Sequence, residues 1–301
     1  MRAMRFHEFG DAGVLRLEEI DKPVAGPGEA LVRVTATSFN PVDATLRAGY
    51  LQQAMPLTLP HIPGLDVAGV TEDGRPVIGF LPMTADGAAA EWVVAPAGIL
   101  TPAPAGIPLA DAAAVPAVAL TAWQALFEHA GVTEGQRVLI NGAGGGVGGY
   151  AVQFAHAAGA HVIATASPRS APIVREQGAD EIIDYTATPV SEAITEPVDV
   201  VLNLVRADDA AMAALVPLVR PGGVVVSTAS PVPEDTDRKV RSISMYVRSD
   251  ATQLATIVER IDAGEVRVDV SSRHALADLP EVHRAAAAGE LRGKAIIVVR
   301  D

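Results

Sequence analysis

The sequence contains no cysteine. This absence excludes disulfide bonds, thiolate zinc sites, iron–sulfur clusters and a cysteine nucleophile. The apolar runs are short and interrupted by glycine or proline, so none approaches the ~18 to 20 residues that span a bilayer. The first ten residues also lack the long apolar region of a secretory signal. We therefore expect a soluble, cytoplasmic protein with no membrane partner.

Positive charge is also scarce. The chain has 23 lysines and arginines against 36 aspartates and glutamates, a net charge of −13. No stripe of basic residues with interleaved aromatics occurs, so nucleic acid is not an expected partner. An anionic cofactor would instead have to be held by local backbone dipoles and a few well-placed arginines.

The organisation of the chain indicates two domains, because 301 residues with 49% hydrophobic composition can bury a large core. Residues 1–110 carry short alternating segments with glycine and proline at the corners, which predicts a partly closed β-barrel. Residues 111–245 alternate helical and strand patterns, which predicts an α/β domain with a doubly wound parallel sheet. Residues 246–301 break this alternation, and we expect them to return to the first domain.

Individual elements follow from the hydrophobic patterns. In the α/β region, the predicted strands are 137–141, 161–166, 181–183, 198–204 and 223–228. In the last region we expect a helix at 251–263, a strand at 266–270, a helix at 279–288 and a strand at 294–299. The stretch Thr71–Pro76 predicts a tight hairpin.

The most informative segment is 136–149, where an apolar strand, a glycine-rich turn and the start of a helix follow one another. Side chains in such a turn would keep the backbone away from a pyrophosphate, which binds N–H groups at the positive end of a helix. The best register on the GxGxxG template uses Ala143, Gly145 and Gly148; the set Gly144, Gly146 and Gly149 also fits formally. The predicted cofactor-binding residues are Ala143, Gly145, Gly146, Val147 and Gly148. The alternative is a turn that only packs a helix on a sheet.

Short motifs elsewhere in the chain occur in a recognisable combination. They are Phe39–Asp43 with Arg47 and Gly49, Pro63–Gly69, Leu120–Leu126, the glycine turn, and Gly178–Asp180 leading to Asp184 and Tyr185. Together they resemble the zinc-independent quinone oxidoreductase, or zeta-crystallin-like, branch of the medium-chain dehydrogenase/reductase superfamily.

This resemblance implies a Rossmann-like nucleotide domain, a GroES-like β-barrel domain for the substrate, and a homodimer. In the zinc enzymes of the superfamily, metal ligands occupy the positions of Asn40 and Leu65. Leucine cannot bind a metal and no cysteine is present, so we expect no metal site and no metal-activated alcohol oxidation.

The expected cofactor is NADPH rather than NADH. The acidic residue that would bind a ribose 2′-hydroxyl is expected about 20 residues after the glycine turn, where Ala166 stands. Ser167 and Arg169 follow and can donate to a 2′-phosphate, and the resemblance adds Tyr185. Alternatively, Arg169 is only solvated near a helix N-terminus.

The resemblance implies hydride transfer from the nicotinamide to a quinone, an enone or an enoyl thioester. Asn40, Tyr50 and Thr121 are the candidate catalytic residues, although Asn40 can simply start a turn and Tyr50 can simply pack. Asp43 more plausibly stabilises the turn or a buried arginine. Met245 and Val247 match a stretch that offers backbone groups to the nicotinamide carboxamide. Val205 is expected to face the cofactor.

A second hypothesis remains open at this point: an NADPH-binding sensor or structural protein with little turnover. The sequence indicates a nucleotide site far more clearly than a catalytic group. The acceptor, the stereochemistry and any proton donor are not predictable from these residues.

Overall fold

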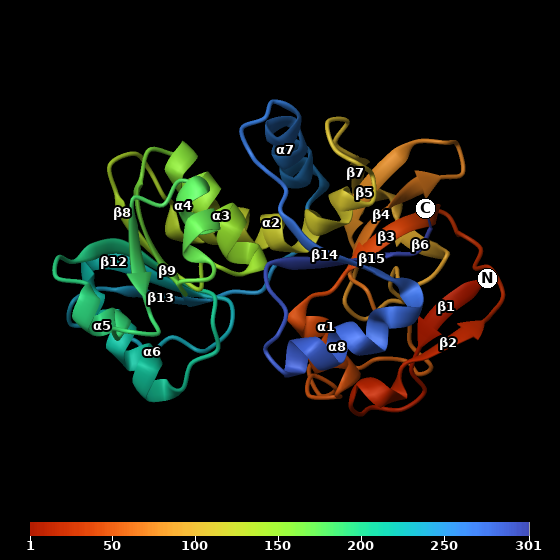
Figure 1. Cartoon of the computed structure of the whole chain (residues 1–301), viewed down its shortest axis with the longest axis horizontal. Helices are drawn as coiled ribbons and strands as arrows, with labels where there is room; N and C mark the ends of the chain where they lie inside the picture. The colour runs from red at the N-terminus through yellow and green to blue at the C-terminus, as the bar shows by residue number, and fades with distance from the viewer. Residues whose placement is uncertain (301) are drawn as a thin grey trace. The chain divides into compact units, whose positions relative to one another are not determined.

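The computed structural model of the chain describes residues 1–300. They form two compact units, which are described separately (Figure 1). The first consists of Met1–Ala117 and the described residues from Ser249 onward, and the second of Val118–Arg248. No helix within residues 1–300 is long and apolar enough to cross a membrane.

The second unit is built on a six-stranded sheet in which every strand pairs in parallel, in the order β10-β9-β8-β11-β12-β13. Its strands are β8 (Arg137–Asn141), β9 (His161–Ala166), β10 (Glu181–Asp184), β11 (Val198–Asn203), β12 (Val219–Ser227) and β13 (Arg241–Ser244). Strand interiors such as Val138, Leu139 and Ile140 are fully buried, as expected for parallel strands covered on both faces. The predicted doubly wound sheet is confirmed.

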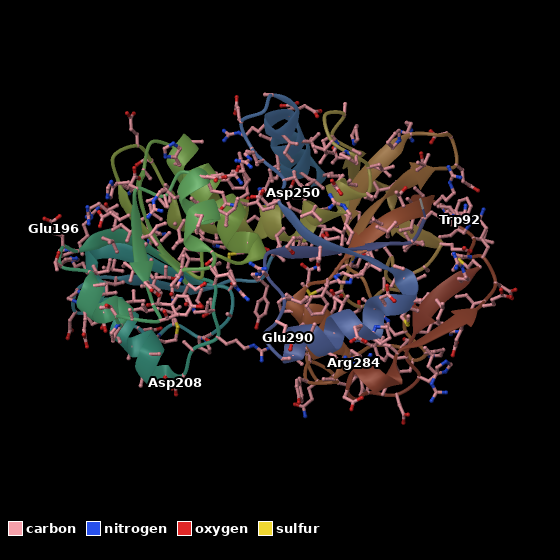
Figure 2. All side chains as sticks on the ribbon, in the orientation of Figure 1. Trp92, Glu196, Asp208, Asp250, Arg284 and Glu290 are labelled. Carbon is pink, nitrogen blue, oxygen red and sulfur yellow. The ribbon has the colours of Figure 1, made fainter. Side chains whose placement is uncertain are left out.

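Helices of this unit connect the strands (Figure 1). They are α2 (Pro116–Trp123, which begins in the first unit), a π-helix (Gln124–Ala130), α3 (Gly146–Ala157), α4 (Ala171–Glu176), α5 (Val190–Ala193) and α6 (Asp209–Leu215). Asp208, labelled in Figure 2, caps α6 by accepting a hydrogen bond from Ala211 N at 2.8 Å. Two boundaries differ from prediction: α3 begins at Gly146 rather than Tyr150, and β12 begins at Val219, because the glycines at these positions adopt regular backbone geometry.

The first unit contains a seven-stranded sheet with the order β14-β15-β3-β4-β5-β7, and β6 pairs with β3. The elements before residue 118 are β1 (Arg2–Arg5), β2 (Arg16–Glu19), β3 (Glu29–Ser38), α1 (Pro41–Arg47), β4 (Asp66–Thr71), β5 (Pro76–Phe80), β6 (Trp92–Pro96) and β7 (Leu100–Pro102). The predicted hairpin is present: Thr71 N donates to Arg75 O at 3.0 Å, and Gly74 provides the positive φ of +85°.

The C-terminal segment supplies α7 (Ala251–Asp262), β14 (Val270–Ala275), α8 (Leu279–Ala287) and β15 (Lys294–Val298). Asp250 caps α7 by accepting from Gln253 N at 3.0 Å (Figure 2). The predicted strand at 266–270 is wrong. Val266 is buried just after α7, whereas the ladder to β15 is formed by the more polar residues 270–275. Backbone pairing with β15 overrides the weak hydrophobic pattern there.

Candidate functional site

The carboxyl edge of the six-stranded sheet contains the point at which the strand order reverses. From β8 the chain moves outward to β9 and β10 on one side, and then to β11, β12 and β13 on the other. Loops that leave β8 and β11 in opposite directions open a crevice at this point, where open α/β sheets bind their ligands. The glycine turn leaves the sheet here, directly after β8.

The glycine turn has the geometry of an anion site. Gly145 is the N-cap of α3, and no hydrogen bond from Gly146 N or Val147 N is found within residues 1–300. A Cβ on Gly145 would meet only Gly142 O, at 3.5 Å. By contrast, a Cβ on Gly148 would lie 2.5 Å from the backbone of Ala143. Gly145 therefore leaves open space in front of free N–H groups, while Gly148 permits close packing of the helix on the turn.

Gly142 makes the sharp turn itself, with φ +99°. A Cβ there would lie 2.7 Å from Val205 Cγ1, so the loop after β11 packs directly on the turn. The predicted register assigned the first fingerprint position to Ala143, but the positive φ and the close packing fall one residue earlier. Val205 lies against the turn and is 39% exposed.

A buried polar network ties the ends of four strands to this turn. Thr165 Oγ1 accepts from Gly142 N at 2.8 Å and donates to Asn141 Oδ1 at 3.0 Å. Asn141 Nδ2 in turn donates to Asn203 Oδ1 at 2.9 Å, and Asn203 Nδ2 donates to Ser227 Oγ at 3.2 Å. Because each buried polar group is satisfied, the network fixes the turn against β9, β11 and β12.

The loop after β9 lies beside the glycine turn, since a Cβ on Gly144 would sit 2.7 Å from Ser170 Oγ. Ser170 Oγ accepts from Ser167 N at 3.1 Å and shapes this loop. Arg169 is exposed, and no hydrogen bond or ion pair of its side chain is found in the described part of the chain. Tyr185, directly after β10, is 55% exposed. The loop thus presents an available cation close to the turn.

The other predicted site residues divide between the two units. Thr121 lies in α2 of the second unit and is 9% exposed. Tyr50 belongs to the first unit and is 80% exposed, just after Gly49. Met245 is buried and follows β13, and Val247 is half-buried. The catalytic roles predicted for Thr121 and Tyr50 stay predictions.

In the first unit, Asn40 belongs to a buried cluster around the carboxylate of Asp66. Asp66 Oδ2 accepts from Asn40 Nδ2 at 2.8 Å, from Lys294 Nζ at 3.1 Å and from Ser38 Oγ. Asp66 Oδ1 accepts from Ala117 N at 2.7 Å. Lys294 Nζ also donates to Asn40 Oδ1 at 2.6 Å. Asp66 and Lys294 are 0% and 3% exposed, so both charges are removed from water.

This cluster gives Asn40 a structural role that the sequence did not reveal. Its amide oxygen and amide nitrogen are both bonded inside the unit, and it is 5% exposed. Its backbone N donates to Asp43 Oδ2 at 2.8 Å, which opens α1. Asp43 therefore stabilises the turn, as predicted. A contact between Asn40 and a substrate carbonyl stays a prediction.

Burial raises the pKa of Asp43 to about 7, although the bond from Asn40 N and the positive charge of Lys294 oppose the rise. The buried Arg47 does not pair with Asp43. Its Nη1 lies 3.3 Å from His283 Nδ1 on α8, and burial together with this guanidinium lowers the pKa of His283 to about 3. Phe39 packs edge-on against the same imidazole, with ring centroids 4.9 Å apart.

His283 is expected to make acid destabilise the protein. Its pKa is 6.5 in the unfolded chain and about 3 in the folded protein, so stability falls as the pH drops below 6.5. At pH 5 the loss amounts to about 2 kcal/mol, from roughly 1.5 units at ~1.36 kcal/mol each. Asp43, whose pKa is raised, acts in the opposite direction between about pH 4 and 7.

The test compares urea unfolding of the parent and His283→Gln at pH 7.5 and pH 5. The stability difference between the two proteins should change by about 2 kcal/mol between these pH values. A constant difference would contradict the assignment. Asp43→Asn provides the control, because it should alter the pH slope with the opposite sign.

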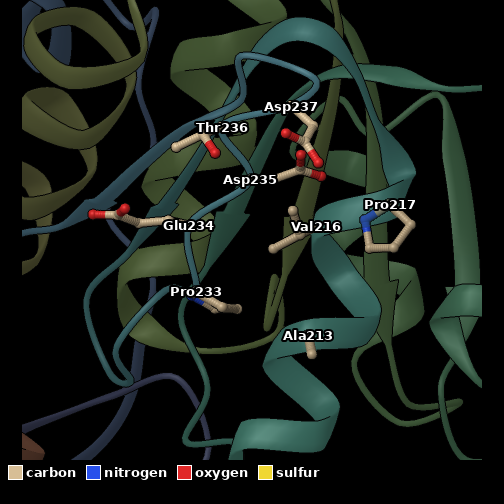
Figure 3. A pocket seen from close by; sticks show the side chains of 8 residues that line it. All are labelled: Ala213, Val216, Pro217, Pro233, Glu234, Asp235, Thr236 and Asp237. Atoms are coloured by element: carbon tan, nitrogen blue, oxygen red, sulfur yellow. The ribbon is translucent and has the colours of Figure 1, made fainter.

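A separate surface pocket of the second unit does not suit a nucleotide. It lies between α6 and the 233–237 loop, and Figure 3 shows carboxylates around it. Its lining includes Glu234, Asp235 and Asp237, and Asp235 is bonded to Arg238 at 2.7 Å. This concentration of negative charge would repel a pyrophosphate.

Sequence reasoning missed Asp66, Lys294, Thr165, Asn203 and His283. A signal existed for Lys294, because a lysine beginning the apolar run Lys294–Val298 has few reasons to be there unless it is paired. Asn203 similarly ends an apolar strand. Nothing local marks His283, whose partners come from distant segments.

Two protein families match this chain. The family described as "Alcohol dehydrogenase GroES-like domain" matches residues 26–78, and that described as "Zinc-binding dehydrogenase" matches residues 177–297. A chloroplast envelope quinone oxidoreductase homolog of Arabidopsis thaliana is 36% identical over 214 residues, which are 65% of this chain and 64% of that protein. The chain thus matches slightly less than two thirds of this relative's length.

Solved structures resemble the chain over nearly its whole length. The quinone oxidoreductase from Coxiella burnetii has a TM-score of 0.89 with 27% identity, covering 100% of this chain and 99% of that one. A mycobacterial protein in complex with NADPH has a TM-score of 0.85 with 26% identity, covering 99% and 100%. The fold is that of a two-domain dehydrogenase with a GroES-like domain. The chain belongs to the quinone oxidoreductase branch of the medium-chain dehydrogenase/reductase superfamily.

Proposed function

We propose that this protein is an NADPH-dependent oxidoreductase that transfers hydride to a quinone or another conjugated carbonyl acceptor without zinc. The observation that carries the proposal is the glycine turn at the reversal of the strand order. There Gly145 leaves open space before the free N–H groups of Gly146 and Val147. The names of the quinone oxidoreductase relatives support the choice of reaction.

In this proposal the pyrophosphate is held at the N-terminus of α3, where the backbone N–H groups and the helix dipole stabilise negative charge. The 2′-phosphate is held by Ser167, Arg169 and Tyr185. Ala166, at the end of β9, presents no carboxylate to repel it. Thr121, Met245 and Val247 contact the nicotinamide.

When bound, the cofactor supplies the hydride, so the chain needs only to orient two flat molecules and exclude water. Protons for the product can come from water, which is why no dedicated acid is assigned.

The side chains at the former metal position do not fit zinc. Leu65 offers no donor atom, and the amide of Asn40 already binds the Lys294 ammonium and Asp66. No group of three or more metal-ligating side chains is found among residues 1–300. A cation placed beside Lys294 would also be repelled. The proposal therefore polarises the acceptor carbonyl by hydrogen bonds rather than by a Lewis acid.

The direct test is NADPH oxidation with a panel of quinones and enones, before and after dialysis against a strong chelator. Acceptor-dependent oxidation that survives dialysis supports the proposal. Tight NADPH binding without acceptor-dependent oxidation would favour the sensor instead. Activity lost on dialysis and restored by zinc would overturn zinc independence.

Arg169→Ala is expected to weaken NADPH binding about ten- to a hundredfold, because a charge-assisted hydrogen bond contributes roughly 1.5–3 kcal/mol. NADH affinity should barely change, since NADH has no 2′-phosphate. Fluorescence titration with both cofactors measures the effect. Arg175→Ala, at an exposed arginine in the last turn of the same helix α4, is the matched control and should change neither affinity. Equal binding of NADPH and NADH by the parent protein would contradict the predicted preference.

A further inference from the structure

The segment Met245–Arg248 leaves the end of β13 without regular secondary structure. Its first residue is anchored, because Met245 N donates to Ser227 O at the end of β12, at 2.9 Å. Tyr246 is 76% exposed. Val247 N–H and C=O have no hydrogen-bond partner within residues 1–300. The segment thus presents one free donor and one free acceptor beside the carboxyl edge of the sheet.

The other end of this segment is clamped by Gln124. Gln124 Nε2 donates to Arg248 O at 3.0 Å, and Gln124 Oε1 accepts from Arg248 N at 3.1 Å. Two bonds from one amide to the main chain of a single residue fix its orientation as well as its position. Gln124 is 1% exposed, so water does not compete for these bonds.

The elements around the clamp are themselves well held. Gln124 begins the π-helix, a distortion that is frequent at functional sites. One turn later, Glu128 accepts two hydrogen bonds from the Arg248 guanidinium, at 2.5 and 2.7 Å. Arg241 of β13 donates to His129 O and Ala130 O at the end of the same π-helix, both at 3.2 Å. The segment is therefore stretched between two rigid anchors.

We propose that Gln124 is a positioning residue for the cofactor: it holds the Met245–Arg248 segment so that Val247 N–H and C=O meet the carboxamide of the nicotinamide ring. A primary carboxamide carries one carbonyl acceptor and one NH₂ donor, which complement these two backbone groups. This inference rests on the proposed NADPH function. It assigns the orientation of the reactive ring to a buried side chain that does not itself touch the cofactor.

The test measures two affinities on each protein, for NADPH and for 2′,5′-ADP, which lacks the nicotinamide. Gln124→Met keeps the length and the apolar contacts of the side chain but removes both hydrogen bonds. NADPH affinity should fall about tenfold, the scale of one to two hydrogen bonds, while 2′,5′-ADP affinity stays the same. Gln124→Glu keeps the bond from Arg248 N but cannot donate to Arg248 O, and it should fall between the parent and the methionine variant.

Gln153→Met is the matched control. Gln153 is a buried glutamine of α3 whose Nε2 donates to Gly149 O at 3.1 Å, so its loss should leave the ratio of the two affinities unchanged. An equal loss for both ligands in either Gln124 variant would reduce Gln124 to a general structural role and overturn the inference. Unchanged NADPH binding would overturn it as well. Failure of the parent to bind NADPH would instead reject the proposed function, and this inference with it.

Discussion

Gly145→Val is expected to abolish NADPH binding while the protein stays folded. The Cβ of the new residue would meet only Gly142 O at 3.5 Å, so the protein itself has room for a side chain. The valine methyl groups would, however, fill the space before the free N–H groups of the first turn of α3, where the pyrophosphate is proposed to bind. Isothermal titration with NADPH, together with circular dichroism, measures binding and folding on the same sample.

Two other glycines sharpen this experiment. Gly148→Val should fail for a different reason, because its Cβ would lie 2.5 Å from the backbone of Ala143 and would push α3 off the turn. The circular dichroism spectrum and the melting temperature should then change as well. Gly98→Val is the matched control, since its Cβ would meet nothing within 4 Å. Normal NADPH binding by folded Gly145→Val would show that the predicted register is wrong, and Gly146 would become the residue to test.

Lys294→Met should destabilise the protein by about 3–5 kcal/mol, the usual result of removing one partner from a buried ion pair. The substitution keeps most of the apolar stem but leaves the carboxylate of Asp66, which is 0% exposed, without its cation. It also removes the donor to Asn40 Oδ1. Urea unfolding at pH 7.5 measures the loss.

The double variant Lys294→Met, Asp66→Asn should recover part of this stability, because no uncompensated charge remains in the core. Arg75→Met is the surface control. Its guanidinium bonds Asp73 at 2.7 Å, but both side chains are more than half exposed, so the loss should be under about 1 kcal/mol. A loss of similar size for Lys294→Met would mean that the buried pair contributes little, and the account of the cluster would have to be abandoned.

The cluster around Asp66 also changes the expected consequence of replacing Asn40. The sequence suggested a direct role for this residue at the reacting carbonyl. In the structure, the same side chain accepts from Lys294 and donates to Asp66, so truncation would disturb folding before it reported on catalysis. Activity measurements on an Asn40 variant are therefore interpretable only beside its unfolding curve.

Much of the nucleotide-binding unit was predictable because its signals are local. Residues 137–141 and 161–166 are continuous apolar runs, and both became strands with the predicted bounds. The glycine turn was recognisable for the same reason, since a tight turn and an open helix N-terminus depend on a few adjacent residues. The absence of an acid at Ala166 likewise needs no tertiary contact to be seen.

Other features were decided only by the tertiary structure, because their partners are far apart in the sequence. Lys294 reaches Asp66 across 228 positions, and Gln124 reaches Arg248 across 124. The strand β14 formed at 270–275 rather than 266–270 because β15 supplied the hydrogen-bonding partner for that backbone. Hydrophobic period and turn chemistry specify elements and the glycine turn. Which buried polar groups satisfy one another is fixed only when the folded chain brings donors and acceptors together away from water.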